Sequence, residues 1–235
     1  NAQGLATFTN LKITGATGNR TLRFTSGSLT PDTSTTVAIT AGAATQIAII
    51  TQPSTTAQSG TNFAQQPVVE LRDVSGNPVL TAGTSITVAI ASGGGSLAGT
   101  ATITTDASGR ATYSGLNITG AAGDRTLSFT SSGLTAATSN AISITAGAAT
   151  TLAIATEPSA TAQNDVVFAQ QPTVQLKDAT GNNVAQADVT ITAVLASGAN
   201  TLGGTLTATT NAQGLATFTN LKITGATGNR TLRFT

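Results

Sequence analysis

The stretch FAQQPVVELRDVSGNP, residues 63–78, carries both signals that decide the fold prediction for this chain. Val69 and Leu71 fall on one face of an extended strand. Glu70 and Arg72 fall on the opposite face, which we expect to face water. The letters VSGNP that follow form a turn by composition, because Gly and Asn adopt positive φ easily and Pro fixes the exit. A strand with one apolar face that ends in a tight turn predicts a sheet that buries one side.

The same stretch returns as FAQQPTVQLKDATGNN at residues 168–183, an offset of 168 − 63 = 105. AGAAT at residues 41–45 returns at residues 146–150 with the same offset. Residues 1–25 return letter for letter as residues 211–235, at twice that offset. Because the register holds without insertions, we predict one structural unit per period, arranged end to end.

The period divides the chain into three parts. Residues 1–40 correspond to the C-terminal part of a truncated repeat, residues 41–145 to a complete repeat, and residues 146–235 to a repeat that lacks its final strand. We interpret the chain as a window of a longer repetitive polypeptide, in which any secretion signal lies upstream.

The complete repeat predicts about seven short strands with turn signals roughly every ten residues. The expected strands lie within residues 46–50, 63–73, 85–91, 100–106, 110–118, 125–131 and 140–146. The core candidates in the second half of the repeat are Tyr113, Leu116, Ile118, Leu127, Phe129, Ile142 and Ile144. No segment has a convincing helical period. This pattern predicts an all-β, antiparallel β-sandwich.

Comparison of the repeats supports this assignment of faces. Tyr113 becomes Phe218 in the next repeat, so this inward position keeps an aromatic ring. We therefore expect the ring of Tyr113 to lie in the core and its hydroxyl to lie at the margin of the core. The outward positions that change are Glu70, Asn117 and Ser128, which become Gln175, Lys222 and Arg233. A register slip of one residue would bury those side chains, so the register is well specified.

Composition excludes several functional classes. Charged residues make up only 8% of the chain and the net charge is +1, so no basic stripe is available and we expect no nucleic-acid partner. The chain has no His and no Cys, which excludes the usual catalytic triads, disulfides and thiolate metal sites. Nine scattered acidic residues form no repeated pair, so we expect no catalysis and no catalytic residue. No uncharged apolar stretch in this window approaches membrane-spanning length.

Several repeated motifs carry a resemblance to a known family. The motifs are TxLAIxTxP, FAQQPxVxLxD, the DxxGN turn, TxAxGxATFxxLxITGxxGxRTLxF and the closing SxAISITAG. Together they resemble the tandem bacterial Ig-like (Big) repeats of cell-surface adhesins, of the invasin and intimin type. The resemblance covers the full chain and implies tandem Ig-like sandwiches in an extracellular or cell-surface stalk, whose binding tip lies elsewhere in the polypeptide. Function inferred in this way is an analogy.

The two DxxGN turns are the candidate metal sites. Asp73 and Asn77 in one turn, and Asp178 and Asn182 in the other, carry oxygen atoms suited to Ca²⁺. One carboxylate per turn is few for an ion that takes six or more oxygen ligands, so we favour Asx-stabilised turns and expect no cofactor.

The junctions between repeats are short and consist of small residues, as in ISITAGAATTLAIAT at residues 142–156. Such connections restrict hinge motion and predict a semi-rigid rod whose main partners are neighbouring repeats. We therefore expect a structural stalk or filament that can also self-associate into bundles. Two alternatives are a module that binds a receptor or glycan through its loops, and a filament subunit that packs laterally and exchanges strands head to tail. We prefer a continuous polypeptide to strand exchange, because the 25-residue overlap would be redundant in an exchanging subunit.

Overall fold

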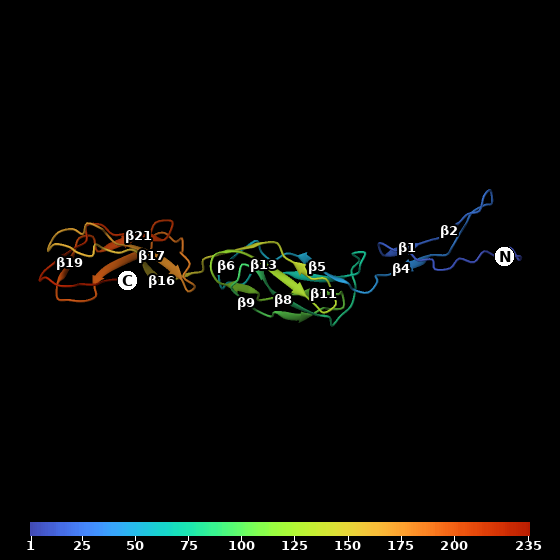
Figure 1. Cartoon of the computed structure of the whole chain (residues 1–235), viewed down its shortest axis with the longest axis horizontal. Helices are drawn as coiled ribbons and strands as arrows, with labels where there is room; N and C mark the ends of the chain where they lie inside the picture. The colour runs from blue at the N-terminus through green and yellow to red at the C-terminus, as the bar shows by residue number, and fades with distance from the viewer.

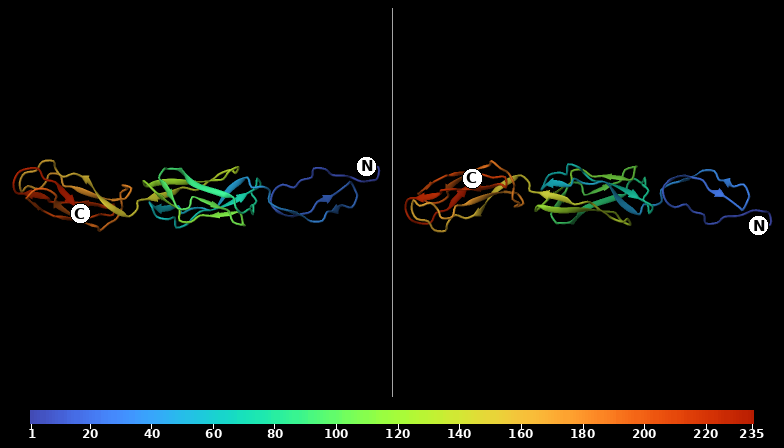
Figure 2. Two further views of the ribbon diagram at one scale, coloured as in Figure 1. Left: turned by 90° about the horizontal axis from the view of Figure 1, so that it is seen from below. Right: turned by 90° about the horizontal axis from the view of Figure 1, so that it is seen from above.

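The computed structural model describes residues 1–235 and consists of strands and connecting segments, with no helix. Three β-rich bodies lie in a row, and the N-terminal residues are at one end (Figure 1). Both perpendicular views show the same row of separate bodies joined by short connections (Figure 2). Because there is no helix, none is available to cross a membrane.

The central body, residues 41–145, is a two-layer sandwich. Its larger sheet has the strand order β10-β8-β13-β15-β6, with β14 added to β13, and its smaller sheet has the order β11-β7-β5. A separate short pair joins β12 to β9. The strands are β5 (Gln46–Thr51), β6 (Thr56–Gln58), β7 (Val68–Arg72), β8 (Ser85–Ser92), β9 (Ser96–Ala98), β10 (Thr102–Thr104), β11 (Arg110–Thr112), β12 (Asn117–Thr119), β13 (Gly123–Thr130), β14 (Ala137–Thr138) and β15 (Ile142–Thr145).

The predicted all-β sandwich is confirmed, with one difference in pairing. The strands of the central body pair antiparallel except β6 and β15, which are parallel, with Ser143 opposite Thr56. Pro53 separates β5 from β6, so the first part of the chain contributes to both sheets: β5 to the smaller one and β6 to the larger one. This switch places a strand from the start of the unit directly beside a strand from its end.

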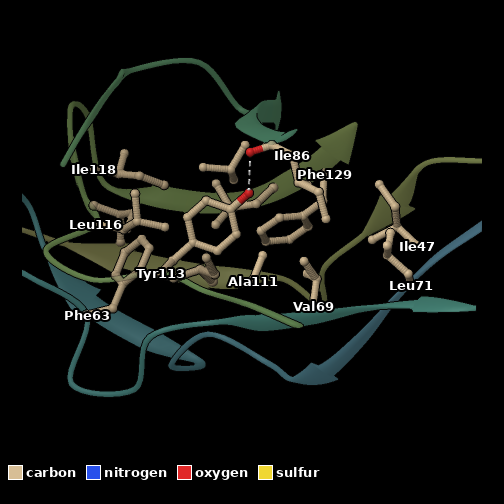
Figure 3. Packing of buried hydrophobic residues seen from close by; sticks show 14 of the residues in the cluster. Ile47, Phe63, Val69, Leu71, Ile86, Ala111, Tyr113, Leu116, Ile118 and Phe129 are labelled. Atoms are coloured by element: carbon tan, nitrogen blue, oxygen red, sulfur yellow. Dashed lines mark hydrogen bonds between the residues drawn. The ribbon is translucent and has the colours of Figure 1, made fainter. Parts of the chain in front are cut away.

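The core of the central body contains the side chains expected from the alternating pattern (Figure 3). All seven core candidates of the second half of the repeat are at most 1% exposed. The Tyr113 ring lies 5.4 Å from the Phe129 ring, centroid to centroid. The expected position of the Tyr113 hydroxyl is wrong: it is buried and donates a hydrogen bond to the carbonyl oxygen of Ile86 at 3.0 Å. That bond satisfies a polar group that burial would otherwise destabilise, and burial raises the pKa of Tyr113 to about 12.

The prediction that the outer face of β7 is exposed to solvent is wrong at Glu70. Glu70 points away from the core, as the alternation requires, yet it is only 2% exposed. Arg110 lies opposite it on the neighbouring strand, and its Nε is 3.0 Å from one carboxylate oxygen. Arg72 contacts the other oxygen at 3.2 Å. The two arginine side chains cover the carboxylate and neutralise it, which makes its burial tolerable.

The equivalent residue in the next repeat, Gln175, is also buried, but backbone carbonyls rather than arginine side chains satisfy it. Gln175 is 8% exposed, and its amide donates to the carbonyl oxygens of Gln213 and Gly214 at 3.0 and 3.1 Å. Leu215 stands where Arg110 stands in the central body. The carboxylate of Glu70 and the guanidinium of Arg110 are therefore both absent from the next repeat. Asn117 and Ser128, also expected to be outward, are partly buried.

The N-terminal body, residues 1–40, contains only two short strand pairs, β1 with β4 and β2 with β3. Its strands are β1 (Gly18–Arg20), β2 (Arg23–Phe24), β3 (Asp32–Thr33) and β4 (Val37–Ile39). These are the counterparts of β13, β14 and β15 in the central body. No opposing sheet covers them, so Phe8 is 60% exposed and Leu11 62% exposed.

Residues 146–235 form a second sandwich with its own core of nine buried apolar residues. Its sheets have the orders β16-β17-β21 and β20-β18-β23, with a separate β19-β22 pair. The strands are β16 (Ala149–Thr156), β17 (Thr173–Asp178), β18 (Thr190–Leu195), β19 (Thr201–Gly203), β20 (Thr207–Thr209), β21 (Leu215–Thr217), β22 (Lys222–Thr224) and β23 (Leu232–Phe234). The body has no strands that correspond to β6 and β15 of the central body.

Candidate functional site at the junctions between units

Each DxxGN turn folds around its aspartate. Oδ1 of Asp73 accepts the backbone N–H groups of Ser75 and Asn77, both at 2.9 Å, which forms an Asx turn. Oδ2 of Asp73 accepts the side-chain amide of Asn77 at 2.9 Å. Gly76 at the tip has a φ of 82°, a left-handed conformation that suits glycine.

The same aspartate also holds the linker that enters the unit. Oδ2 of Asp73 accepts the backbone N–H of Gly42 at 2.9 Å, and Oδ2 of Asp178 accepts that of Gly147 at 2.8 Å. Both glycines belong to the repeated AGAAT segment. The turn therefore fixes the direction in which the connecting chain arrives.

The asparagine of each turn reaches across the junction to the preceding unit. In the first junction, Asn77 Nδ2 donates to the carbonyl oxygen of Gly15 at 2.9 Å, and Asn77 Oδ1 accepts the N–H of Thr17 at 3.1 Å. These are contacts between residues about 60 positions apart in the sequence. They join the N-terminal body to the central body.

The second junction has the same arrangement. Asn182 Nδ2 donates to the carbonyl oxygen of Gly120 at 3.0 Å, and Asn182 Oδ1 accepts the N–H of Ala122 at 2.9 Å. The hydroxyl of Thr180 adds a bond to the Gly120 carbonyl at 3.2 Å. Each partner in this junction lies 105 residues after its counterpart in the first, so one set of contacts is built twice.

A buried arginine shapes the loop that Asn182 contacts. Arg125 is 5% exposed, and its guanidinium donates to the carbonyl oxygens of Gly94, Ala121 and Asp124 at 2.7 to 2.9 Å. These bonds connect the two ends of the TGAAGDR loop, residues 119–125, and join the loop to Gly94. Arg20 is exposed and makes two of the three matching bonds within TGATGNR of the N-terminal body, to the carbonyl oxygens of Ala16 and Asn19. The same loop presents the Gly120 carbonyl and the Ala122 N–H to the next unit.

The hydrogen bonds of the turns stabilise the charged aspartates. The Asn77 amide, followed by the Gly42 N–H and the turn N–H groups, lowers the pKa of Asp73 to about 2. Burial acts in the opposite direction on Asp178, yet the bonds from Asn182 and from the linker glycine outweigh it and lower the pKa of Asp178 well below the usual range.

The geometry of the turns does not fit a calcium site. The structure brings each predicted pair together, Asp73 with Asn77 and Asp178 with Asn182, but the amide nitrogen of the asparagine points at the carboxylate. Four N–H groups surround the one carboxylate of the first turn. The chain has no group of three or more acidic, His or Cys side chains that could hold a metal ion. The turn is thus arranged to accept N–H groups, and a cation would have to displace them.

Sequence reasoning identified the turns but not their role across the junction. The sequence alone does not single out the loop residues that the asparagines contact or the arginine within the loop, which are Gly15, Thr17, Gly120, Ala122 and Arg125. A signal was available, because the loop TGxxGxR and the turn DxxGN both recur with the 105-residue period. Nothing in the sequence, however, states that one of these motifs contacts the other across two units.

Three comparisons with known proteins address the fold. The sequence profile of the family described as SMCHD1 Ig-like domain 6 matches residues 147–235, less than half of the chain. This match agrees with the two-layer architecture, and the chain has an all-β, Ig-like sandwich fold. No curated protein sequence matches the chain.

Among solved structures, the chain is similar to the C-terminal 282-residue fragment of intimin, in complex with the intimin-binding domain of the translocated intimin receptor. The identity is 18%, the alignment covers 82% of this chain and 64% of the intimin fragment, and the TM-score is 0.34. The chain thus spans less than two thirds of the length of that fragment. The TM-score is too low for the arrangement of the units to be compared between the two proteins.

Proposed function

We propose that this chain is part of an extracellular or cell-surface rod, the stalk or filament of a bacterial surface structure built from tandem Ig-like units. The observation that carries the proposal is the repeated junction, in which the same asparagine and aspartate contacts recur one period apart. A chain that builds the same junction twice can propagate one geometry along many units. The bacterial and extracellular assignment depends on the resemblance of the repeat motifs to Big repeats.

The parallel pair β6–β15 supports a load-bearing role. The chain enters the central unit just before β5 and leaves it just after β15. Force applied along the rod would therefore pull β6 and β15 in opposite directions along their common axis. Their bonds, including Ser143 N–H to Thr55 O at 2.8 Å and Ser59 N–H to Thr145 O at 2.9 Å, would be loaded in shear and would have to break together.

The central unit offers little for recognition of a ligand by aromatic stacking. Its aromatic rings, Phe63, Tyr113 and Phe129, are all at most 3% exposed. A glycan platform requires exposed rings, so the binding alternative has no support from this unit. The buried rings instead fill the sandwich that the rod repeats.

Electron microscopy of the native material tests the proposal. We expect long strands of uniform width with a regular axial repeat. Short, separate particles would contradict it and would favour a binding module.

A pulling experiment tests the mechanical part separately. When the chain is stretched from its ends, unfolding of the central unit should release roughly 350 Å of chain, from about 3.3 Å per residue over one period. Ser143→Pro removes one β6–β15 bond and should lower the rupture force. Thr104→Pro, on the edge strand β10 at a position whose N–H faces away from β8, is the control for the proline itself and should leave that force unchanged. Equal rupture forces for the two variants would contradict the shear argument.

A further inference from the structure

The hydroxyl of Ser59 holds one residue of the junction loop by both of its backbone groups. Ser59 Oγ accepts the N–H of Gly120 at 3.1 Å and donates to the Gly120 carbonyl oxygen at 3.2 Å. Ser59 follows directly after β6, so these bonds join segments 61 residues apart. The Gly120 carbonyl is also the group to which Asn182 of the following unit donates. Ser59 therefore restrains the acceptor that the next unit uses, without a hydrogen bond of its own to that unit.

Gly120 has no side chain that could fix its orientation. A Cβ at this position would lie 3.1 Å from the Cα of Gly95, so the loop packs against the glycine-rich stretch at a distance that favours glycine. A glycine backbone is also the most flexible that a chain can contain. The two hydrogen bonds from Ser59 therefore supply a restraint that Gly120 itself cannot provide.

The backbone of Ser59 contacts the segment by which the chain leaves the central unit. Its N–H donates to the carbonyl oxygen of Thr145, the last residue of β15, at 2.9 Å. Its carbonyl oxygen lies beside the linker, since a Cβ at Gly147 would be only 3.0 Å from it and 3.6 Å from Oδ2 of Asp178 in the following unit. Ser59 therefore sets the position of the junction loop relative to the outgoing linker.

The next repeat makes the equivalent bond with a different residue. Asn164 stands one period after Ser59, and its Oδ1 accepts the N–H of Gly225, the counterpart of Gly120, at 2.8 Å. In both units a short polar side chain at the same position accepts the same backbone N–H. The hydrogen bond to the loop glycine, and not the serine itself, is thus the feature that the repeats share.

We propose that Ser59 is a positioning residue of the junction, which fixes the Gly120 carbonyl and the Ala122 N–H in the directions that Asn182 requires. The bond from Ser59 to Thr145 belongs to the β6–β15 pair, so release of that pair would also release the loop on which the next unit docks. Docking of one unit and integrity of the preceding unit are therefore linked. The inference rests on the proposed rod, because it uses the same junction and the same load-bearing pair.

Amide hydrogen exchange of the 235-residue chain, measured by NMR, tests this role. The N–H of Ala122 donates to Asn182 Oδ1 across the junction, so its protection reports docking under native conditions. Ser59→Ala should raise the exchange rate of this amide about 2- to 10-fold, the effect of weakening roughly one hydrogen bond. The fluorescence of Tyr113, the one tyrosine in a chain without tryptophan, shows whether the central unit of each variant is folded.

Two further variants are matched controls. Ser54 is another partly buried serine of the same unit, and its Oγ accepts the N–H of Gln65 at 2.7 Å, away from the junction loop. Ser54→Ala therefore removes a comparable bond and should leave exchange at Ala122 unchanged. Ser59→Asn introduces the residue that the next repeat has at this position. It retains an acceptor for the loop glycine and should keep Ala122 protected.

The inference is overturned if Ala122 exchanges at the parent rate in Ser59→Ala, if Ser54→Ala accelerates it equally, or if Ser59→Asn is as fast as Ser59→Ala. Asn182→Ala separates this result from the proposed function. If Asn182→Ala also leaves the Ala122 rate unchanged, the junction itself is wrong, and the rod loses its main support. If Asn182→Ala accelerates exchange and Ser59→Ala does not, only the role of Ser59 is wrong.

Discussion

Substitution of Asn182 by Ala tests whether the asparagine contacts hold adjacent units together. The change removes two bonds across the second junction, one to the Gly120 carbonyl at 3.0 Å and one from the Ala122 N–H at 2.9 Å. A hydrogen bond contributes a net ~0.5–1.5 kcal/mol, so docking of the two units should weaken by roughly 1–3 kcal/mol. The equilibrium constant between docked and undocked junctions should therefore shift about 5- to 150-fold toward the undocked state.

Distance measurement by pulsed electron paramagnetic resonance detects this shift. The chain has no cysteine, so spin labels can be placed cleanly at Thr104→Cys and Thr209→Cys, two exposed positions one period apart in adjacent units. The parent should give one narrow distance distribution. Asn182→Ala should give a broad one, while each unit keeps its own fold.

Asn211→Ala is the matched control. Asn211 accepts two backbone N–H groups in an Asx turn within one unit, and it makes no contact across the junction. It should therefore destabilise its own turn and leave the distribution narrow. If Asn182→Ala is as narrow as the parent, or the parent is already as broad as the variant, then the asparagine contacts do not set the geometry of the junction.

Three further predictions follow from the turns and the core. Hydrogen bonds depress the pKa values of Asp73 and Asp178, so the stability that these carboxylates add is complete above about pH 4, and the part from Asp73 is lost as the pH falls toward 2. Thermal melts should show this acid step, and Asp73→Asn should reduce it. Tyr113→Phe removes the bond to the Ile86 carbonyl and leaves that oxygen buried, so chemical denaturation should show the central unit destabilised by about 1–3 kcal/mol; no change would indicate that the oxygen is satisfied in another way. Calcium or a chelator should leave the melting temperature unchanged, since N–H groups occupy the turn carboxylates, and a calcium-dependent rise would restore the metal-site hypothesis.

Much of the fold could be predicted because the inward positions depend on local periodicity. Ile86 and Val88 alternate along one strand, and both are at most 2% exposed. Tyr113 and Phe129 could be assigned to the core because an aromatic ring recurs at both positions in other repeats. Neither inference required knowledge of which strands are neighbours.

The failures concern contacts between residues distant in the sequence. The alternation of charged and apolar residues predicts that Glu70 faces water, but Arg110, 40 residues later, covers it. The parallel pairing of β6 with β15 joins segments almost 90 residues apart, which no local pattern reveals. The contact between Asn77 and Gly15 crosses from one unit to another. In each case the pairing of strands or units determines the environment, and the side-chain pattern alone does not.

Residual dipolar couplings of the two sandwich units within the 235-residue chain test the rod most directly. If the junction of Asp178 and Asn182 fixes their relative orientation, couplings from residues 41–145 and from residues 146–235 should fit one common alignment tensor. Two tensors of different magnitude would mean that the units reorient independently. The chain would then be a flexible string of sandwiches, and the account of a semi-rigid rod would be wrong.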